Sequence, residues 1–168
     1  MARPKKSAND PATQDEILKA ARIEFGEQGI GAPLDAIAKR CGITRPSLLH
    51  HYKSKQALVG AVVNDILEKT RQRLLSAIAT GEGDYVGTIN SVIKVLRELE
   101  EEEKGVGGVL IHAMLNERDG EVTKGVTELI EVIHSTAVMA GAATRHPTDE
   151  LRASIAQLVM GEIARIAI

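Results

Sequence analysis

Residues 34–55 of this 168-residue chain read LDAIAKRCGITRPSLLHHYKSK. Two short segments with apolar residues at helical spacing flank Gly42, which can adopt a positive φ without a Cβ clash. Thr44 is placed to cap the second segment, and Pro46 is tolerated in a first helical turn. The stretch therefore predicts a helix-turn-helix, a motif that lays its second helix in the major groove of DNA.

The rest of the chain is also predicted to be helical. Apolar residues recur at helical spacing, and no segment alternates convincingly at period two. Thr13 and Glu16 form a capping-box sequence, and Gly29 favours a helix end. We expect an all-α fold. Its eight helices are expected at about 13–28, 33–40, 45–52, 55–79, 85–103, 109–116, 122–137 and 149–166.

The expected organisation is a flexible basic arm followed by two helical domains. The arm covers residues 1–12, the DNA-binding domain with the helix-turn-helix covers 13–54, and the ligand-binding and dimerisation domain covers 55–168. Arg3, Lys5 and Lys6 make the arm basic. Such arms follow the DNA backbone or enter the minor groove, and the alternative is a tail without function.

Charge is uneven along the chain, although the formal net charge is only −2. Residues 1–60 hold ten Lys and Arg against six Asp and Glu, whereas the remainder holds eleven against seventeen. A basic end on an acidic body suits a polyanionic partner. The single cysteine, Cys41, excludes an internal disulfide and a thiol cluster for a metal. No segment resembles a secretory signal or a membrane span, so we expect a soluble, cytoplasmic protein.

A set of spaced positions in and beside the opening stretch carries a family pattern. These positions are Ile37, Ala38, Gly42, Ser47, Leu48, Leu49, His51, Tyr52, Ser54, Lys55 and Leu58. Their spacing resembles that of the TetR family of bacterial one-component transcriptional regulators, over about residues 13–60. Two departures stand out. Before the second helix, the family commonly has a Thr that caps the helix and contacts a phosphate, and this chain has Ala32. In the third helix, the family frequently has a Tyr that contacts a phosphate, and this chain has Leu49. Both predict weaker contact with phosphate.

The predicted DNA contacts come from the second helix of the motif and the start of the next helix. They are Thr44, Arg45, Pro46, Ser47, Leu49, His50, His51, Tyr52, Lys53 and Lys55. Arg45 can bond a guanine edge in bidentate fashion or else a phosphate, and Ser47 and His50 can bond base edges or sugar-phosphate oxygens. Lys53 and Lys55 place ammonium charge beside a helix N-terminus. The alternative is a solvated basic loop.

The C-terminal half predicts an aliphatic interior, because the chain has one Phe, two Tyr and no Trp. His112 follows an apolar run and is the expected polar group in a ligand cavity. Gly105 to Gly108 lacks dinucleotide-loop spacing. Met114, Met139 and Met160 are expected as core filler. The acidic run 100–103 opposes its helix dipole, which predicts fraying or a nearby basic partner.

The last two helices carry broad apolar stripes, and the chain stops without a polar tail. We expect these helices to pair with those of a second copy in a four-helix bundle, as the family resemblance also implies. The expected dimerisation residues are Val126, Ile130, Ile133, Ala137, Leu151, Ile155, Leu158, Val159, Ile163 and Ile166. The alternative is that the last helix closes the core of its own chain.

The expected function is that of a ligand-responsive, DNA-binding transcriptional regulator. The default form is a repressor that binds a palindromic operator as a homodimer and is released by a small molecule. The alternative is a helical interaction module that has lost specific DNA binding. No catalytic set, metal cluster or cofactor motif has the required spacing, so we expect no enzyme, no metal and no cofactor.

Overall fold

The computed structural model describes residues 11–80, 85–102, 105–116, 120–139 and 148–166. Within these ranges the chain forms helices and turns and no strand, which confirms the all-α prediction. The helices are α1 (Pro11–Gln28), α2 (Leu34–Cys41), α3 (Arg45–His51), α4 (Lys55–Thr80), α5 (Tyr85–Glu102), α6 (Val106–Asn116), α7 (Glu121–Met139) and α8 (Thr148–Ile166).

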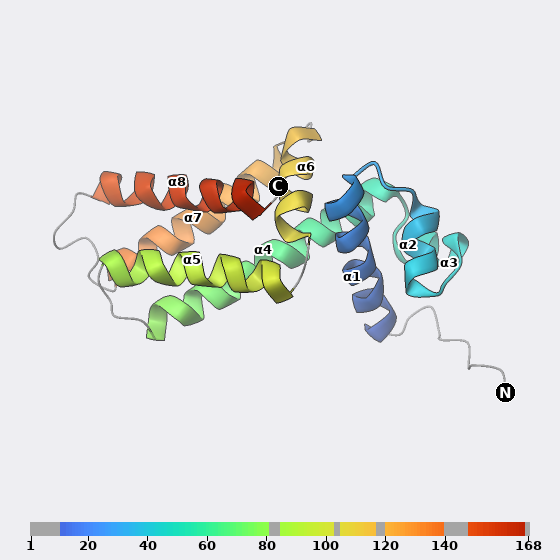
Figure 1. Ribbon diagram of the computed structural model, residues 1–168, viewed down its shortest axis with the longest axis horizontal. Helices are drawn as coiled ribbons and strands as arrows, with labels where there is room; N and C mark the ends of the chain where they lie inside the picture. The colour runs from blue at the N-terminus through green and yellow to red at the C-terminus, as the bar shows by residue number, and fades with distance from the viewer. Residues whose placement is uncertain (1–10, 81–84, 103–104, 117–119, 140–147, 167–168) are drawn as a thin grey trace.

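The 26-residue helix α4 connects the two ends of the molecule. Helices α1, α2 and α3 gather around its first turns and form what we call the head, residues 11–54 (Figure 1). Helices α5, α7 and α8 run along the rest of α4 and form, with α6, what we call the body, residues 55–166 (Figure 1). Helix α3 therefore lies at one extremity of an elongated molecule.

The core is continuous from head to body and almost entirely aliphatic. Phe25 is fully buried in the head, and the body is filled by Leu, Ile, Val and Ala side chains. Only four buried residues of the described ranges are polar or charged, namely Arg22, Glu24, Thr70 and Thr88. The interior thus matches the expectation drawn from the scarcity of aromatic residues.

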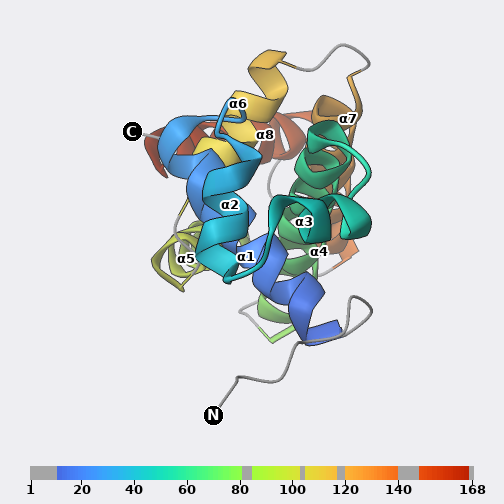
Figure 2. The same ribbon diagram turned by 90° about the vertical axis from the view of Figure 1, so that its right-hand side faces the viewer.

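Helix α6 joins the body to the head through a close backbone contact with α1, beside which it lies (Figures 1 and 2). A Cβ on Gly26 of α1 would lie 2.5 Å from the Cα of Gly105, and a Cβ on Gly108 would lie 2.9 Å from the carbonyl oxygen of Gly26. No real Cβ fits at such distances. The glycines therefore let the two helix backbones touch.

Two helices begin at least two residues earlier than predicted. Helix α1 starts at Pro11 and not at Thr13. Helix α6 starts at Val106 and not at Val109, because Glu100 supplies its cap. The carboxylate of Glu100 accepts hydrogen bonds from the backbone N–H of Gly105 at 2.8 Å and of Gly107 at 3.1 Å. These two bonds satisfy donors that a helix start leaves open.

The acidic run has the basic partner that was expected. Glu102 pairs with Arg73 of α4, with 2.5 Å between carboxylate oxygen and guanidinium nitrogen. Glu100 is occupied at the start of α6, and residue 103 lies outside the described ranges. The run therefore ties the end of α5 to two neighbouring helices.

Candidate nucleic-acid interface

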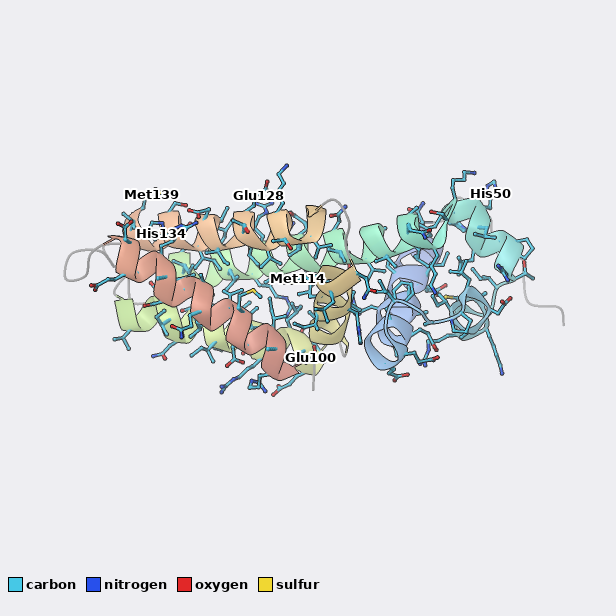
Figure 3. All side chains as sticks on the ribbon, turned by 90° about the horizontal axis from the view of Figure 1, so that it is seen from above. His50, Glu100, Met114, Glu128, His134 and Met139 are labelled. Atoms are coloured by element: carbon cyan, nitrogen blue, oxygen red, sulfur yellow. The ribbon has the colours of Figure 1, made fainter. Side chains whose placement is uncertain are left out.

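Helix α3 is held on the head by one buried side chain and presents the others outward. Leu48 is fully buried, whereas Arg45, Ser47 and His50 are exposed. Thr44 is the N-cap, and its Oγ1 accepts a hydrogen bond from the backbone N–H of Ser47 at 3.3 Å. The predicted cap is confirmed. Figure 3 shows His50 at the end of the molecule remote from α7.

The turn before α3 has the geometry that the sequence predicts. Gly42 is the C-cap of α2 with φ 69° and ψ 27°, in the left-handed region that glycine tolerates best. Its N–H and that of Ile43 bond to the carbonyls of Lys39 and Ala38 at 3.1 and 3.0 Å. These bonds close the last turn of α2 and fix the path of the chain into α3.

A buried carboxylate holds α2 against α1. Glu24 of α1 has a side chain only 7% exposed and accepts a hydrogen bond from Arg40 Nε of α2 at 2.7 Å. Arg40 also contacts Glu27 at 3.5 Å, and the bond to Glu24 is the largest influence that raises the pKa of Arg40. The pair fixes the angle at which α2 presents the turn and α3. Sequence reasoning did not identify it.

The segment between α3 and α4 carries the second group of predicted contacts. Lys53 is exposed, and Lys55 is half-buried as the first residue of α4. Ser54 caps that helix, because its Oγ accepts from the N–H of Ala57 at 3.0 Å. Tyr52 is half-buried, and burial raises the pKa of its phenol, with smaller contributions from Asp15 and Asp65. Both lysines thus stand beside the amino end of α4.

The ten predicted DNA-contacting residues come together at this end of the head. Six are exposed and four are half-buried, and none is enclosed in the core. The exposed residues are Thr44, Arg45, Pro46, Ser47, His50 and Lys53, and the half-buried ones are Leu49, His51, Tyr52 and Lys55. The ring centroids of His50 and His51 are 6.1 Å apart, and the planes of the two rings are nearly perpendicular.

One acidic residue of this surface was missed by sequence reasoning. Asp35, in the first turn of α2, forms an ion pair with Arg45, with 3.1 Å between Oδ2 and the guanidinium nitrogen. Both side chains are more than half exposed. The two residues are ten positions apart and lie on different helices, so helical spacing in the sequence could not predict their contact.

Comparison with known proteins extends the likeness beyond the motif. The sequence pattern of bacterial regulatory proteins of the tetR family matches residues 17–62, from α1 into α4. The HTH-type transcriptional regulator UidR of Escherichia coli K12 is 30% identical over 129 residues, which are 69% of this chain and 63% of UidR. The head and the start of α4 therefore match the TetR family.

Other similar proteins are also named as regulators. The chain spans less than two thirds of the length of UidR. The HTH-type transcriptional repressor KstR2 of Mycolicibacterium smegmatis is 39% identical over 62 residues, 36% of this chain and 30% of that protein. The fatty acid degradation regulator FadR of Bacillus halodurans superposes with a TM-score of 0.66 at 14% identity, covering 90% of this chain and 88% of that chain. FadR therefore shares the fold.

The start of α2 lies one residue later than the prediction for Ala32 assumed. The N-cap of α2 is Pro33, with φ −68° and ψ 138°, and no side chain caps the helix. Ala32 is buried in the preceding turn and donates its N–H to the carbonyl of Gly29 at 3.0 Å. The capping position is therefore Pro33 and not Ala32. Leu49, the second departure, packs against the core.

The structure places His112 against the head, and its predicted role in a ligand cavity stays a prediction. Three atoms of its imidazole lie 3.4 to 3.5 Å from the place where a Cβ would stand on Gly29, in the turn after α1. His112 is half-buried and contacts the head from α6. The groove found between α4 and α7 has a volume of about 400 Å³ and does not include His112. Its lining includes Leu67, Leu129, Val132, Glu68, Arg71 and Glu128.

The predicted dimerisation residues lie within the core of their own chain. The inward residues of α8 recur every four positions. Helix α8 packs against α5, α6 and α7, and α7 packs against α4 and α6. Of the ten predicted residues, Leu158 is half-buried, and the side chain of Ile166 lies outside the described residues. The other eight are buried, namely Val126, Ile130, Ile133, Ala137, Leu151, Ile155, Val159 and Ile163. Enclosed side chains have no surface to offer a second copy, which corrects their assignment as contact residues.

The outer faces of α7 and α8 have a different composition. Between Glu150 and Arg165, which are both exposed, the outward stripe of α8 is uncharged and consists of Ala153, Gln157, Met160, Gly161 and Ala164. Met139 of α7 is 81% exposed and Met160 is 37% exposed, so both were wrongly expected as core filler. Met139 lies at the outer end of α7 (Figure 3). Met114 does pack against the core, as predicted.

Several predictions concern sites that the structure bears on only in part. The basic arm 1–12 and its Arg3, Lys5 and Lys6 lie outside the residues whose side chains are described. Among the described residues, no three His, Cys, Asp or Glu side chains are arranged to hold a metal ion. The described helices include none with both the length and the apolar character to cross a membrane.

Proposed function

We propose that this chain is a DNA-binding transcription regulator whose helix α3 reads the major groove. The observation that carries the proposal is the composition of α3. Its buried Leu48 anchors it, and Arg45, Ser47 and His50 are exposed together at one extremity of the molecule. Arginine is the side chain that most often reads guanine in this groove. The named regulators UidR and KstR2 support the same function.

The proposed division of labour within the interface follows from the position of each side chain. Arg45 opens α3 and is the proposed base reader. Lys53 and Lys55 flank the amino end of α4, where ammonium charge and free backbone N–H groups attract the same phosphate. The proposed domain boundary stays between 54 and 55, where the cap of α4 ends the head.

We further propose that the chain acts as a homodimer and as a repressor that a small molecule releases. A twofold dimer would use the uncharged outer face of α8, around Met160. Two α3 helices would then stand about 34–36 Å apart, one DNA turn, and read a palindromic operator. The groove between α4 and α7, about 400 Å³, has the volume of a small-molecule site. An effector there would act by favouring one placement of α4.

A selection followed by salt titration tests the proposal. The wild-type protein is used to enrich duplexes from a random library, and fluorescence anisotropy then measures affinity for the enriched duplex and for a scrambled one. If the dimer neutralises about six to ten phosphates, affinity falls roughly 10³–10⁵-fold between 50 and 200 mM salt. An inverted repeat in the enriched duplex is the expected result.

Two alanine variants separate the reader from the anchor. Arg45→Ala is expected to weaken binding to the enriched duplex by about 1–3 kcal/mol, or roughly 5- to 150-fold, and to relax selectivity at one base pair. Lys55→Ala is expected to weaken both duplexes similarly and to reduce the salt slope by about one. If the two variants behave alike on every duplex, the division of roles is wrong.

The competing function is a helical interaction module that no longer binds a specific sequence. Pro33 at an uncapped helix start and Leu49 in place of a phosphate-contacting Tyr favour it. The selection distinguishes the two functions. A wild-type protein that enriches no sequence at low salt would establish the module and contradict the regulator.

A further inference from the structure

The ion pair between Asp35 and Arg45 lies in the surface that is proposed to meet DNA. Asp35 lies in the first turn of α2, Arg45 is the first residue of α3, and their Oδ2 and guanidinium nitrogen are 3.1 Å apart. The side chains are 66% and 55% exposed. An ion pair so exposed contributes little to folding. Because the pair lies beside α3, its effect is expected on DNA binding.

A carboxylate at this place opposes contact with phosphate. The amino end of a helix ordinarily attracts an anion, because its free N–H groups and dipole point outward. Here that end of α2 has no capping side chain and carries Asp35 in its first turn. The negative charge satisfies the helix dipole internally and repels an approaching DNA strand.

The same carboxylate holds the guanidinium of Arg45 in place before DNA arrives. Every duplex, whatever its sequence, offers Arg45 phosphates, and the carboxylate of Asp35 repels each phosphate that would displace it. A guanine edge at the correct position offers two acceptors in the groove, away from the strand. The pair thus penalises phosphate contact more than base contact.

We propose that Asp35 is a specificity-determining residue, which restrains Arg45 from binding phosphate and so suppresses binding to arbitrary DNA. The inference rests on the proposed function, because it presupposes that α3 meets a duplex. Asp35 makes no contact with the bases in this role; it acts through Arg45.

The test compares Asp35→Asn with a matched control, Asp149→Asn. Asp149 is exposed in the first turn of α8, so its substitution removes the same charge away from the head. Affinities of both variants are measured on the enriched and scrambled duplexes over a salt series. Thermal unfolding checks that both variants fold like the wild-type protein.

Asp35→Asn is expected to bind the scrambled duplex roughly three- to tenfold more tightly near 0.1 M salt, with a salt slope steeper by about 0.9, because Arg45 gains one phosphate. Affinity for the enriched duplex is expected to change less than about twofold, so the specificity ratio falls. In an Arg45→Ala background, Asp35→Asn is expected to do no more than Asp149→Asn.

Three results would overturn the inference. If Asp35→Asn behaves like Asp149→Asn while the wild-type protein still discriminates, Asp35 has no such role, and the proposed function stands. If Asp35→Asn gains as much without Arg45 as with it, the carboxylate acts as a general charge and not through the pair. If the wild-type protein enriches no sequence, the proposed function fails as well, and the inference fails with it.

Discussion

Single side chains decide how helix α3 is held on the head. Leu48 is the anchor of α3, and the caps Thr44 and Ser54 fix the starts of α3 and α4. These three features are local, so their residue types and spacing were enough to predict them. The contact between Asp35 and Arg45 was not predictable in this way, because it depends on the angle between two helices across the Gly42 turn.

Cys41 gives a prediction at the same scale. Burial, more than the neighbouring carboxylate of Glu16, raises the pKa of its thiol from 9.0 to about 11, although Arg40 opposes the change. A higher pKa leaves less thiolate at a given pH, and the thiolate is the nucleophile. We expect iodoacetamide near pH 8 to alkylate Cys41 in the native protein ~100-fold more slowly than in the unfolded chain.

The control for this experiment is the same protein in concentrated urea, followed by mass spectrometry. Both samples contain one thiol, so the ratio of the two rates reports the environment of Cys41 alone. Equal rates in the native and unfolded protein would show that Cys41 keeps an ordinary pKa.

At the scale of the element, α6 is where the sequence and the structure differ most. Its predicted start at Val109 missed a full turn, because the glycines before it read as a loop. The cap comes from Glu100, five residues before Gly105, and the close partner is Gly26 in a distant helix. Neither contact has a periodic signal in the sequence. The register of α6 therefore depends on tertiary contacts.

The glycine contact between α1 and α6 predicts opposite outcomes for two similar substitutions. Gly26→Ala is expected to destabilise the protein by about 1–3 kcal/mol, because the methyl group would meet the backbone of Gly105. Gly60→Ala, in α4, is expected to stabilise it by about 0.5–1 kcal/mol, because nothing lies within 4 Å and alanine favours a helix. Urea unfolding measures both free energies. A shift of the same sign in both variants would contradict the tight contact.

At the scale of the whole molecule, the number of helices and their order followed from apolar periodicity, and their partners did not. The inward stripe of α8, through Ile155 and Val159, was predicted as apolar, yet it was assigned to a second copy. Periodicity identifies a face that must be covered. It does not say whether α5 and α6 of the same chain or helices of another chain cover it.

The proposed dimer gives a prediction at this scale. Met160→Glu places a charge on the outer face of α8, and burying an unpaired carboxylate between two chains is costly. We expect sedimentation equilibrium to give a dimer dissociation constant roughly tenfold or more above that of the wild-type protein. Val86→Glu is the control, because Val86 is 61% exposed on α5. Unchanged association in Met160→Glu would place the interface elsewhere.

The contact of Gly26 with Gly105 and Gly108 also limits how this chain can be recombined with others. A chimaera that grafts residues 11–54 onto a foreign effector module keeps Gly26 but exchanges the residues opposite to it. Any side chain at the position of Gly105 or Gly108 would push the grafted head away from the foreign module. Successful module exchange would therefore require a host with glycine at both places, whatever operator or inducer the designer intends.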